Sequence, residues 1–259
     1  MDSIESEGVK TSRTKSFLLT LTVEPLVLFY IIPSTMNQLI TQNLFLEKSC
    51  RFTLAYNDSV CSAMSRKESS GYSDIQEYKV HQEVSEMMFV KSFVHGIIPL
   101  VLMFFAGSWS DENSKRKPCI LGPIIGELIA IICLIMNVVF LNQMPILLTS
   151  LAYTLPMAMS GGWPCLFLGL YSYVTTSTSA ETLTMKIGSV VTTHNIAMIV
   201  GIGLAGILLN LLGFIGAYGA TFFMILSSLV YGYYIIKDRK LIIPDIEDEI
   251  HNLEKTPKN

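Results

Sequence analysis

Two long stretches of this chain carry no charged side chain at all. Residues 187–236 contain no Asp, Glu, Lys or Arg, and neither do residues 145–180. About 20 apolar residues form a helix long enough to cross the roughly 30 Å hydrocarbon core of a bilayer. Only 15% of the 259 residues are charged, whereas soluble domains carry about 25%. These features exclude a soluble enzyme, a nucleic-acid-binding protein and a disulfide-rich secreted domain.

The apolar runs predict an all-α, polytopic membrane protein with six transmembrane helices. The runs are long and continuous, whereas the strands of a transmembrane barrel would be short and would alternate. A single helix over residues 187–236 would be about 75 Å long, so Gly213 and Gly216 are expected to mark a turn within it. We place the spans at about residues 17–38, 86–106, 119–141, 146–171, 187–211 and 214–236.

Basic residues indicate the orientation of the spans. Lys and Arg gather in the N-terminal tail (1–16), between the second and third spans, and in the charged C-terminal tail (237–259). The positive-inside rule therefore places both termini in the cytosol. The transmembrane domain covers residues 17–236, with a long external loop at 43–85. We expect the protein in the plasma membrane or an endolysosomal membrane.

The external loop contains the features of a segment outside the cytosol. Asn57-Asp58-Ser59 matches the acceptor pattern for N-glycosylation. Cys50 and Cys61 lie in the same loop, where an oxidising compartment permits disulfides. They could pair with each other, or one of them could pair elsewhere. The other three cysteines lie in spans and are expected to pack. No metal-ligand spacing, cofactor motif or nucleophile motif is present in the sequence, so we expect neither a metal, nor a cofactor, nor enzymatic activity.

The segment between the second and third spans carries a charged motif. A glycine, Gly107, is followed by Asp111 and then by the basic cluster Lys115, Arg116 and Lys117. Glycine lets two helices approach closely, and an aspartate is favoured at a helix N-terminus. This pattern resembles the loop signature of major-facilitator transporters, which implies that these residues lock or gate the cytosolic side. The alternative is a positive-inside loop that happens to contain an aspartate.

A wider set of motifs resembles one particular group of transporters. The motifs are residues 22–26 (TVEPL), 107–111 (GSWSD), 121–126 (LGPIIG), 160–162 (SGG) and 171–173 (YSY). In this order they are similar to the solute-carrier group that includes the proton-coupled folate transporter and the thymic stromal cotransporter. The resemblance covers the chain from the first span to the last, and the long external loop also fits it.

The resemblance implies a major-facilitator fold and proton-coupled uptake of an organic anion, such as a folate-like solute. That family has twelve spans in two six-helix halves, with substrate bound between the halves. The chain therefore corresponds to the N-terminal half. The expected partners are lipid, protons, a small anionic substrate, and either a second six-helix half or a homo- or heterodimer partner. The alternative is a non-transporting truncated membrane protein that associates with or regulates a full-length relative.

Polar residues inside the spans are candidates for the transport cavity or for proton binding, because ionisable groups in a membrane usually face a cavity or a partner. The candidates are Glu24, Glu127, His194 and Asn195. Alternatively, Glu24 pairs with another helix, Glu127 pairs with the basic loop, and His194 is a packed, hydrogen-bonded histidine. In the folate-transporting relatives the fifth span carries a carboxylate that helps proton coupling, and the resemblance places Ser189 at this position.

Three further expectations concern the shape of the bundle. Lys91 and His95 lie four residues apart on one face of the second span, and Lys91 is expected to extend to the outer membrane surface. Asn37 and Gln38 are expected to line an external vestibule. Residues 161–164 (GGWP) predict an irregular fourth span, which is tolerated where a span lines protein or water.

Overall fold

The computed structural model describes residues 2–68, 70–113, 117–140, 145–178 and 180–236, and for residues 2–22, 106, 108–113, 177, 180 and 181 it describes the backbone alone. The described chain is helical throughout and contains no strand. In order its elements are α1 (Asp2–Lys48), the π-helical turn η1 (Ser49–Thr53), α2 (Asp58–Arg66), α3 (Asp74–Asn113), α4 (Lys117–Val139), α5 (Ile146–Met159), α6 (Gly162–Ser177) and α7 (Ala180–Ile235).

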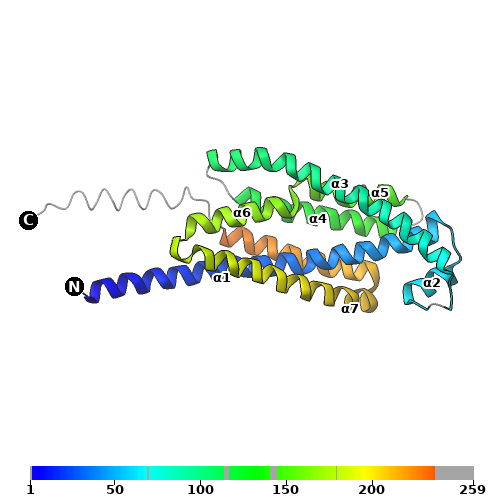
Figure 1. Ribbon diagram of the computed structural model, residues 1–259, viewed down its shortest axis with the longest axis horizontal. Helices are drawn as coiled ribbons and strands as arrows, with labels where there is room; N and C mark the ends of the chain where they lie inside the picture. Colours follow the sequence, from blue (N-terminus) through cyan, green and yellow to red (C-terminus); the bar gives the residue numbers. More distant parts are fainter. Residues whose placement is uncertain (1, 69, 114–116, 141–144, 179, 237–259) are drawn as a thin grey trace, which may run out of the picture.

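The long helices lie alongside one another in an elongated bundle (Figure 1). The chain runs along the bundle through α1, α3, α4, the pair α5 and α6, and the two arms of α7. The all-α, polytopic fold predicted from the apolar runs is therefore confirmed. The helices are longer than the predicted spans: α1 continues past residue 38 to Lys48, and α3 begins at Asp74 rather than at residue 86. Hydropathy marks the apolar part of a helix, whereas polar residues can continue the same helix outside the membrane.

Three described helical stretches are long and apolar enough to cross a membrane, at residues 74–105, 117–139 and 182–235. The last of these is interrupted at Gly213, whose backbone has φ 64° and ψ −174°. Positive φ is accessible to glycine at little cost, and the chain turns back at this end of the bundle (Figure 1). The predicted turn near Gly213 is therefore present, and α7 supplies two passes.

The fourth pass is broken in its middle. α5 ends at Met159 and α6 begins at Gly162. Gly161 and Gly162 both have positive φ, 89° and 54°. Because α5 and α6 have 14 and 16 residues, each is shorter than the roughly 20 residues that one crossing requires. Together they form one irregular span, as the sequence predicted.

Helix α1 forms the centre of the packing. Its most extensive contact is with α7, while α4 packs against α5, α6 and α7. α1 buries Val27, Tyr30 and Ile31 completely. The helices α1 and α7 approach closely at Gly201, where an added Cβ would lie 2.7 Å from the carbonyl oxygen of Ile32. Small residues allow such close contacts between membrane helices.

A compact segment joins α1 to α3 at one end of the bundle. Cys50 and Cys61 form a disulfide, with their Cα atoms 5.8 Å apart. Arg51 lies 3.1 Å from a carboxylate oxygen of Glu47 and 2.5 Å from one of Asp58. The disulfide and the ion pairs hold η1 and α2 against the end of α1. Of the two disulfide pairings left open by the sequence, the structure contains the one within this segment.

Candidate functional site

A carboxyl group is buried in the middle of the bundle. Glu127 of α4 is 0% exposed. The side-chain amide of Asn37 on α1 donates a hydrogen bond to Glu127 Oε1 at 3.5 Å. The hydroxyl of Thr221 on α7 donates to Asn37 Oδ1 at 2.6 Å. Glu127 is thereby connected through Asn37 to two other helices, and we refer to Glu127, Asn37 and Thr221 as the central triad.

Other neutral groups surround the central triad. Tyr30 and Ser34 of α1 interact with the Glu127 carboxyl group, and the indole nitrogen of Trp163 on α6 donates to Ser34 Oγ at 3.0 Å. Tyr30 OH and Glu127 Oε2 make no hydrogen bond within the described residues. An ionised Glu127 would thus lack a countercharge in this part of the bundle, and an unpaired charge inside a membrane is costly.

Glu24 of α1 interacts with the first arm of α7, the one that precedes Gly213. The hydroxyl of Ser189 on α7 donates a hydrogen bond to Glu24 Oε1. The structure therefore shows Glu24 in contact with another helix. It also places a carboxylate from α1 directly beside Ser189, the position at which the resemblance to folate-transporting relatives implies a carboxylate on the fifth span.

His194 and Asn195 point to different surroundings. The His194 ring packs edge-on against Phe167 and Trp163 of α6, with centroid distances of 5.0 and 6.0 Å. Its Nε2 has no hydrogen bond within the described residues. Asn195 is exposed, and its amide donates to the carbonyl of Val191 in its own helix at 3.0 Å. The two neighbours in sequence therefore do not form one site.

The sequence predicted that Lys91 extends to the outer membrane surface, but in the structure this side chain turns toward the bundle. Its ammonium lies 4.9 Å from the ring centroid of Tyr153, a buried residue of α5. His95, one turn further along α3, interacts electrostatically with Lys91. It also lies against the break in the fourth pass, because a Cβ added to Gly162 would be 3.3 Å from His95 Nε2. Lys91 makes no ion pair within the described residues.

The loop motif between α3 and α4 is only partly described. Gly107 and the backbone of Asp111 lie in the last turns of α3. The Asp111 side chain and all of Lys115 and Arg116 lie outside the described residues. Lys117, the first residue of α4, donates to the carbonyl of Tyr233 on α7 at 2.6 Å, and its ammonium lies 4.0 Å from the Tyr233 ring centroid. This residue therefore ties the start of α4 to the end of α7.

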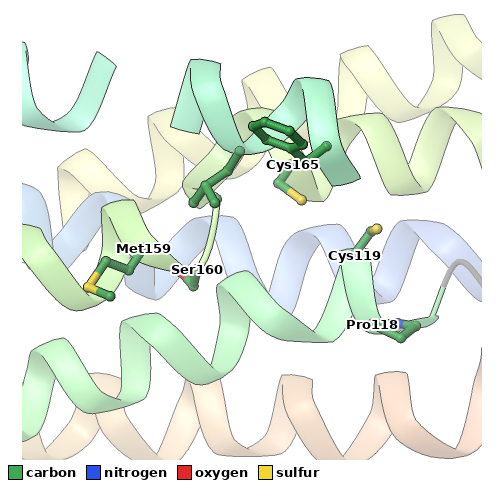
Figure 2. Close-up of a pocket in the computed structure, with 8 residues that line it drawn as sticks. Pro118, Cys119, Met159, Ser160 and Cys165 are labelled. Carbon is green, nitrogen blue, oxygen red and sulfur yellow. The ribbon is translucent and has the colours of Figure 1, made fainter. Parts of the chain in front are cut away.

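A pocket of about 380 Å³ opens beside the break in the fourth pass (Figure 2). Its walls come from α3, the start of α4, and the α5–α6 junction. The thiols of Cys119 and Cys165 face the same space between helices in Figure 2. The lining is largely apolar, with Leu102, Phe105, Pro118, Cys119, Met159, Ser160, Gly161 and Cys165 around it.

The structure corrects two expectations about polar residues. Asn37 does not line an external vestibule but is completely buried in the central triad, whereas Gln38, the next residue, is exposed. The 100° turn between successive helical residues separates them. Within the described residues Glu127 makes no ion pair, with Lys117 of the basic loop or with any other cation, and it contacts Asn37, which projects from α1 into the bundle interior.

Tyr30, Ser34, Thr41 and Thr221 were not among the candidates predicted from the sequence, whereas Asn37 was. Tyr30, Ser34, Asn37 and Thr41 recur every three or four residues and therefore share one face of α1. Each takes part in a contact with another helix, and Thr41 lies 3.2 Å from the hydroxyl of Tyr218. This polar stripe within an apolar span was the available signal. On α7, Tyr218, Thr221 and Ser228 are spaced by three and seven residues, share one face and contact α1, so the same kind of signal was present there.

A second buried polar chain lies near the end of α1. Lys48 is 1% exposed and donates to the hydroxyl of Thr149 on α5 at 2.6 Å. That hydroxyl in turn donates to Asn137 Oδ1 on α4 at 2.9 Å. This chain connects the disulfide-bearing end of α1 to α4 and α5, and it shares no residue with the central triad.

The comparison with known protein families agrees with this architecture. The family model described as Major Facilitator Superfamily matches residues 77–253. No curated protein and no solved structure matches the chain significantly. Because the family match extends over more than half of the 259 residues and the structure is a bundle of long apolar helices, the chain belongs to the Major Facilitator Superfamily, a family of membrane transporters.

Proposed function

We propose that the chain serves the proton-coupled uptake of an organic anion, such as a folate-like solute, across the plasma membrane or an endolysosomal membrane. The observation that carries this proposal is the central triad. Glu127 is fully buried and is surrounded by uncharged hydrogen-bonding groups from α1. A carboxyl group in such a place can accept and release a proton, and its charge change would alter the contacts among α1, α4 and α7.

The contact between Glu24 and Ser189 also supports proton coupling. The resemblance to folate-transporting relatives implies a carboxylate on the fifth span, and this chain has serine there. Since the Ser189 hydroxyl donates to the Glu24 carboxylate, α1 supplies an acidic group at the same location. Glu24 and Glu127 are therefore the two acidic residues to which we assign a part in proton movement.

The substrate path would lie between these six passes and a second set of six, which is the arrangement the family resemblance implies. α3 and α7 carry large exposed apolar side chains, such as Phe93 and Phe104 on α3 and Ile199 on α7. In this arrangement part of that surface contacts the second set of helices and the remainder contacts lipid. Asp111 and Arg116 would lock the cytosolic loop during the transport cycle.

Uptake into liposomes tests the proposal. The purified chain is reconstituted, and accumulation of radiolabelled folate is measured with and without an inward proton gradient. The gradient should stimulate uptake by the unmodified chain but not by Glu127→Gln, which retains an amide for hydrogen bonding but cannot carry a proton. Glu86→Gln is the matched control, because Glu86 is an exposed acid on α3 and its loss should leave stimulation unchanged. Asp111→Ala should slow uptake at every pH without reducing membrane insertion.

Gradient-stimulated uptake that persists in Glu127→Gln would exclude Glu127 as the coupling group.

A second function is favoured by the exposed apolar faces of α3 and α7: the chain could associate with a full-length relative without transporting substrate itself. In that case the reconstituted chain would show no uptake with or without a gradient. It would instead co-purify with the relative and change the relative's uptake rate.

A further inference from the structure

One face of α3 changes from charged to apolar along its length. Lys91, His95, Ile98, Leu102 and Phe105 are spaced by three or four residues, so they project from the same side of the helix. This side faces the fourth pass, since α3 packs against α5 and α6. The two cationic or titratable residues come first, and the two residues that line the pocket come last. Over the seven residues from His95 to Leu102 the helix rises by about 10 Å.

The apolar end of this face opens into the pocket shown in Figure 2. Leu102 and Phe105 form one wall, and the buried Cys119 and Cys165 lie on the others. Ser160 contributes the single hydroxyl side chain of the lining. A space of about 380 Å³ lies within the range of ligand pockets. Its walls suit the hydrocarbon part of a ligand.

The charged end adjoins the same pocket through two consecutive glycines. Gly161 lines the pocket, and its neighbour Gly162 lies against His95 Nε2. Lys91 follows one turn away, over the face of the Tyr153 ring. Within the described residues Lys91 contacts this aromatic ring but no carboxylate. A cation in such a position inside a membrane protein is expected to face a partner or a ligand of opposite charge.

We propose that the space between α3 and the α5–α6 junction binds an amphipathic organic acid, with its carboxylate at Lys91 and His95 and its apolar body in the pocket formed by Leu102, Cys119 and Cys165. This inference rests on the proposed function in one respect, the anionic charge of the substrate. It adds the form of the anion, an acidic head attached to an apolar body. The break at Gly161 and Gly162 lies between the two parts of this site, because Gly161 lines the pocket and Gly162 lies against His95.

Quenching of Trp163 fluorescence tests this assignment directly. Trp163 follows Gly162, and the chain contains one other tryptophan, Trp109, which is replaced in a Trp109→Phe background. The probe is decanoate brominated on its terminal carbon, because bromine quenches indole emission at short range. Bromodecanol, with the same chain and no charge, measures the binding that the apolar pocket provides without a carboxylate. In the background protein bromodecanoate should half-saturate at a concentration about tenfold lower than bromodecanol.

Substitutions test the two ends of the site separately. Lys91→Met should raise the half-saturating concentration of bromodecanoate about tenfold, to that of bromodecanol, whereas Lys91→Arg should retain tight binding. Lys79→Met removes an exposed lysine from the same helix and should have no effect. Leu102→Phe narrows the pocket and should weaken quenching by both probes. Leu100→Phe is its control, because Leu100 is exposed on α3 and does not line the pocket.

Two results would overturn the inference. Equal quenching by acid and alcohol in the background protein would show that no charge is recognised. Identical curves for Leu102→Phe and Leu100→Phe would show that the pocket is not used. Thermal unfolding of the purified variants, followed by circular dichroism, identifies any variant that fails to fold. In that case Lys91→Gln replaces Lys91→Met, or Leu102→Met replaces Leu102→Phe. Binding is measured without a gradient, so the absence of proton-coupled uptake would contradict the proposed function alone.

Discussion

At the scale of single residues, Asn37 is a buried polar group that bonds to two other helices. Its amide nitrogen donates to Glu127 and its amide oxygen accepts from Thr221. Asn37 thus joins α1, α4 and α7 through both ends of one side chain. A buried polar group that loses its partner retains the full cost of its desolvation. Removal of Asn37 takes a hydrogen-bond partner from both Glu127 and Thr221, although Thr221 keeps its bond to the Tyr218 carbonyl.

We expect Asn37→Leu to destabilise the protein by about 1–3 kcal/mol, because Glu127 and Thr221 lose their hydrogen-bond partner. Thermal unfolding in detergent, followed by circular dichroism, measures the change. The matched control is Asn195→Leu, since Asn195 is exposed and bonds only within its own helix. If both variants melted at the same temperature, the central triad would contribute nothing to stability. A Thr221→Val substitution added to Asn37→Leu should cost less than Thr221→Val alone, because the two residues share one hydrogen bond.

At the scale of elements, the break between α5 and α6 shapes the fourth pass. Its position was evident in the sequence, since two adjacent glycines followed by proline are poorly suited to a continuous helix. The residues that the break brings together were not evident. Gly161 packs against Cys165, and Gly162 packs against His95 of α3. The contact with His95 depends on how α3 lies along the fourth pass, and no local sequence pattern specifies that position.

Gly161→Ala should destabilise the protein by about 1–3 kcal/mol. The residue has φ 89°, which is costly for a residue with a side chain, and the new Cβ would lie 2.5 Å from the Cβ of Cys165. Gly203→Ala is the matched control, because Gly203 is helical and exposed and has no heavy atom within 4 Å of an added Cβ. That control should be neutral or slightly stabilising, since alanine favours helix over glycine. Equal melting temperatures for the two variants would contradict the conformation assigned to the break.

At the scale of the whole molecule, the position of the external segment fixes the orientation of every helix. The disulfide between Cys50 and Cys61 and the exposed Asn57 at the start of α2 lie in one segment. A disulfide is favoured outside the cytosol, and a glycan on Asn57 could be added only there, so both features support the expectation that this segment is external. The basic residues near the other ends of the helices indicate the same orientation. The disulfide, the glycosylation pattern and the basic residues are independent indications of orientation, so an experiment on one of them tests the others.

We expect the chain made in a eukaryotic cell to carry one N-linked glycan at Asn57, the only acceptor pattern in its sequence. Treatment with an N-glycosidase should increase its electrophoretic mobility, and both Asn57→Gln and Ser59→Ala should remove that shift. A peptide tag fused after residue 259 should remain inaccessible to an antibody added to intact cells, because both termini are expected in the cytosol. Two results together would indicate the opposite orientation. The chain would carry no glycan, and a protease added outside would cut the 43–85 loop only after the membrane is permeabilised.

The sequence by itself determined that this protein is a bundle of membrane helices, where the fifth and sixth passes turn back at Gly213, and where the fourth pass is irregular. These properties follow from hydropathy and backbone freedom, both of which are local. The tertiary structure alone decided that Asn37 faces Glu127 rather than a vestibule, that Lys91 lies over Tyr153, and that Thr221 completes the triad. Asn37 and Thr221 are separated by 184 residues, and their contact depends on the rotation of each helix about its axis. In a membrane both lipid and protein can cover an apolar face, so hydropathy does not fix that rotation, and packing between small residues and polar contacts does.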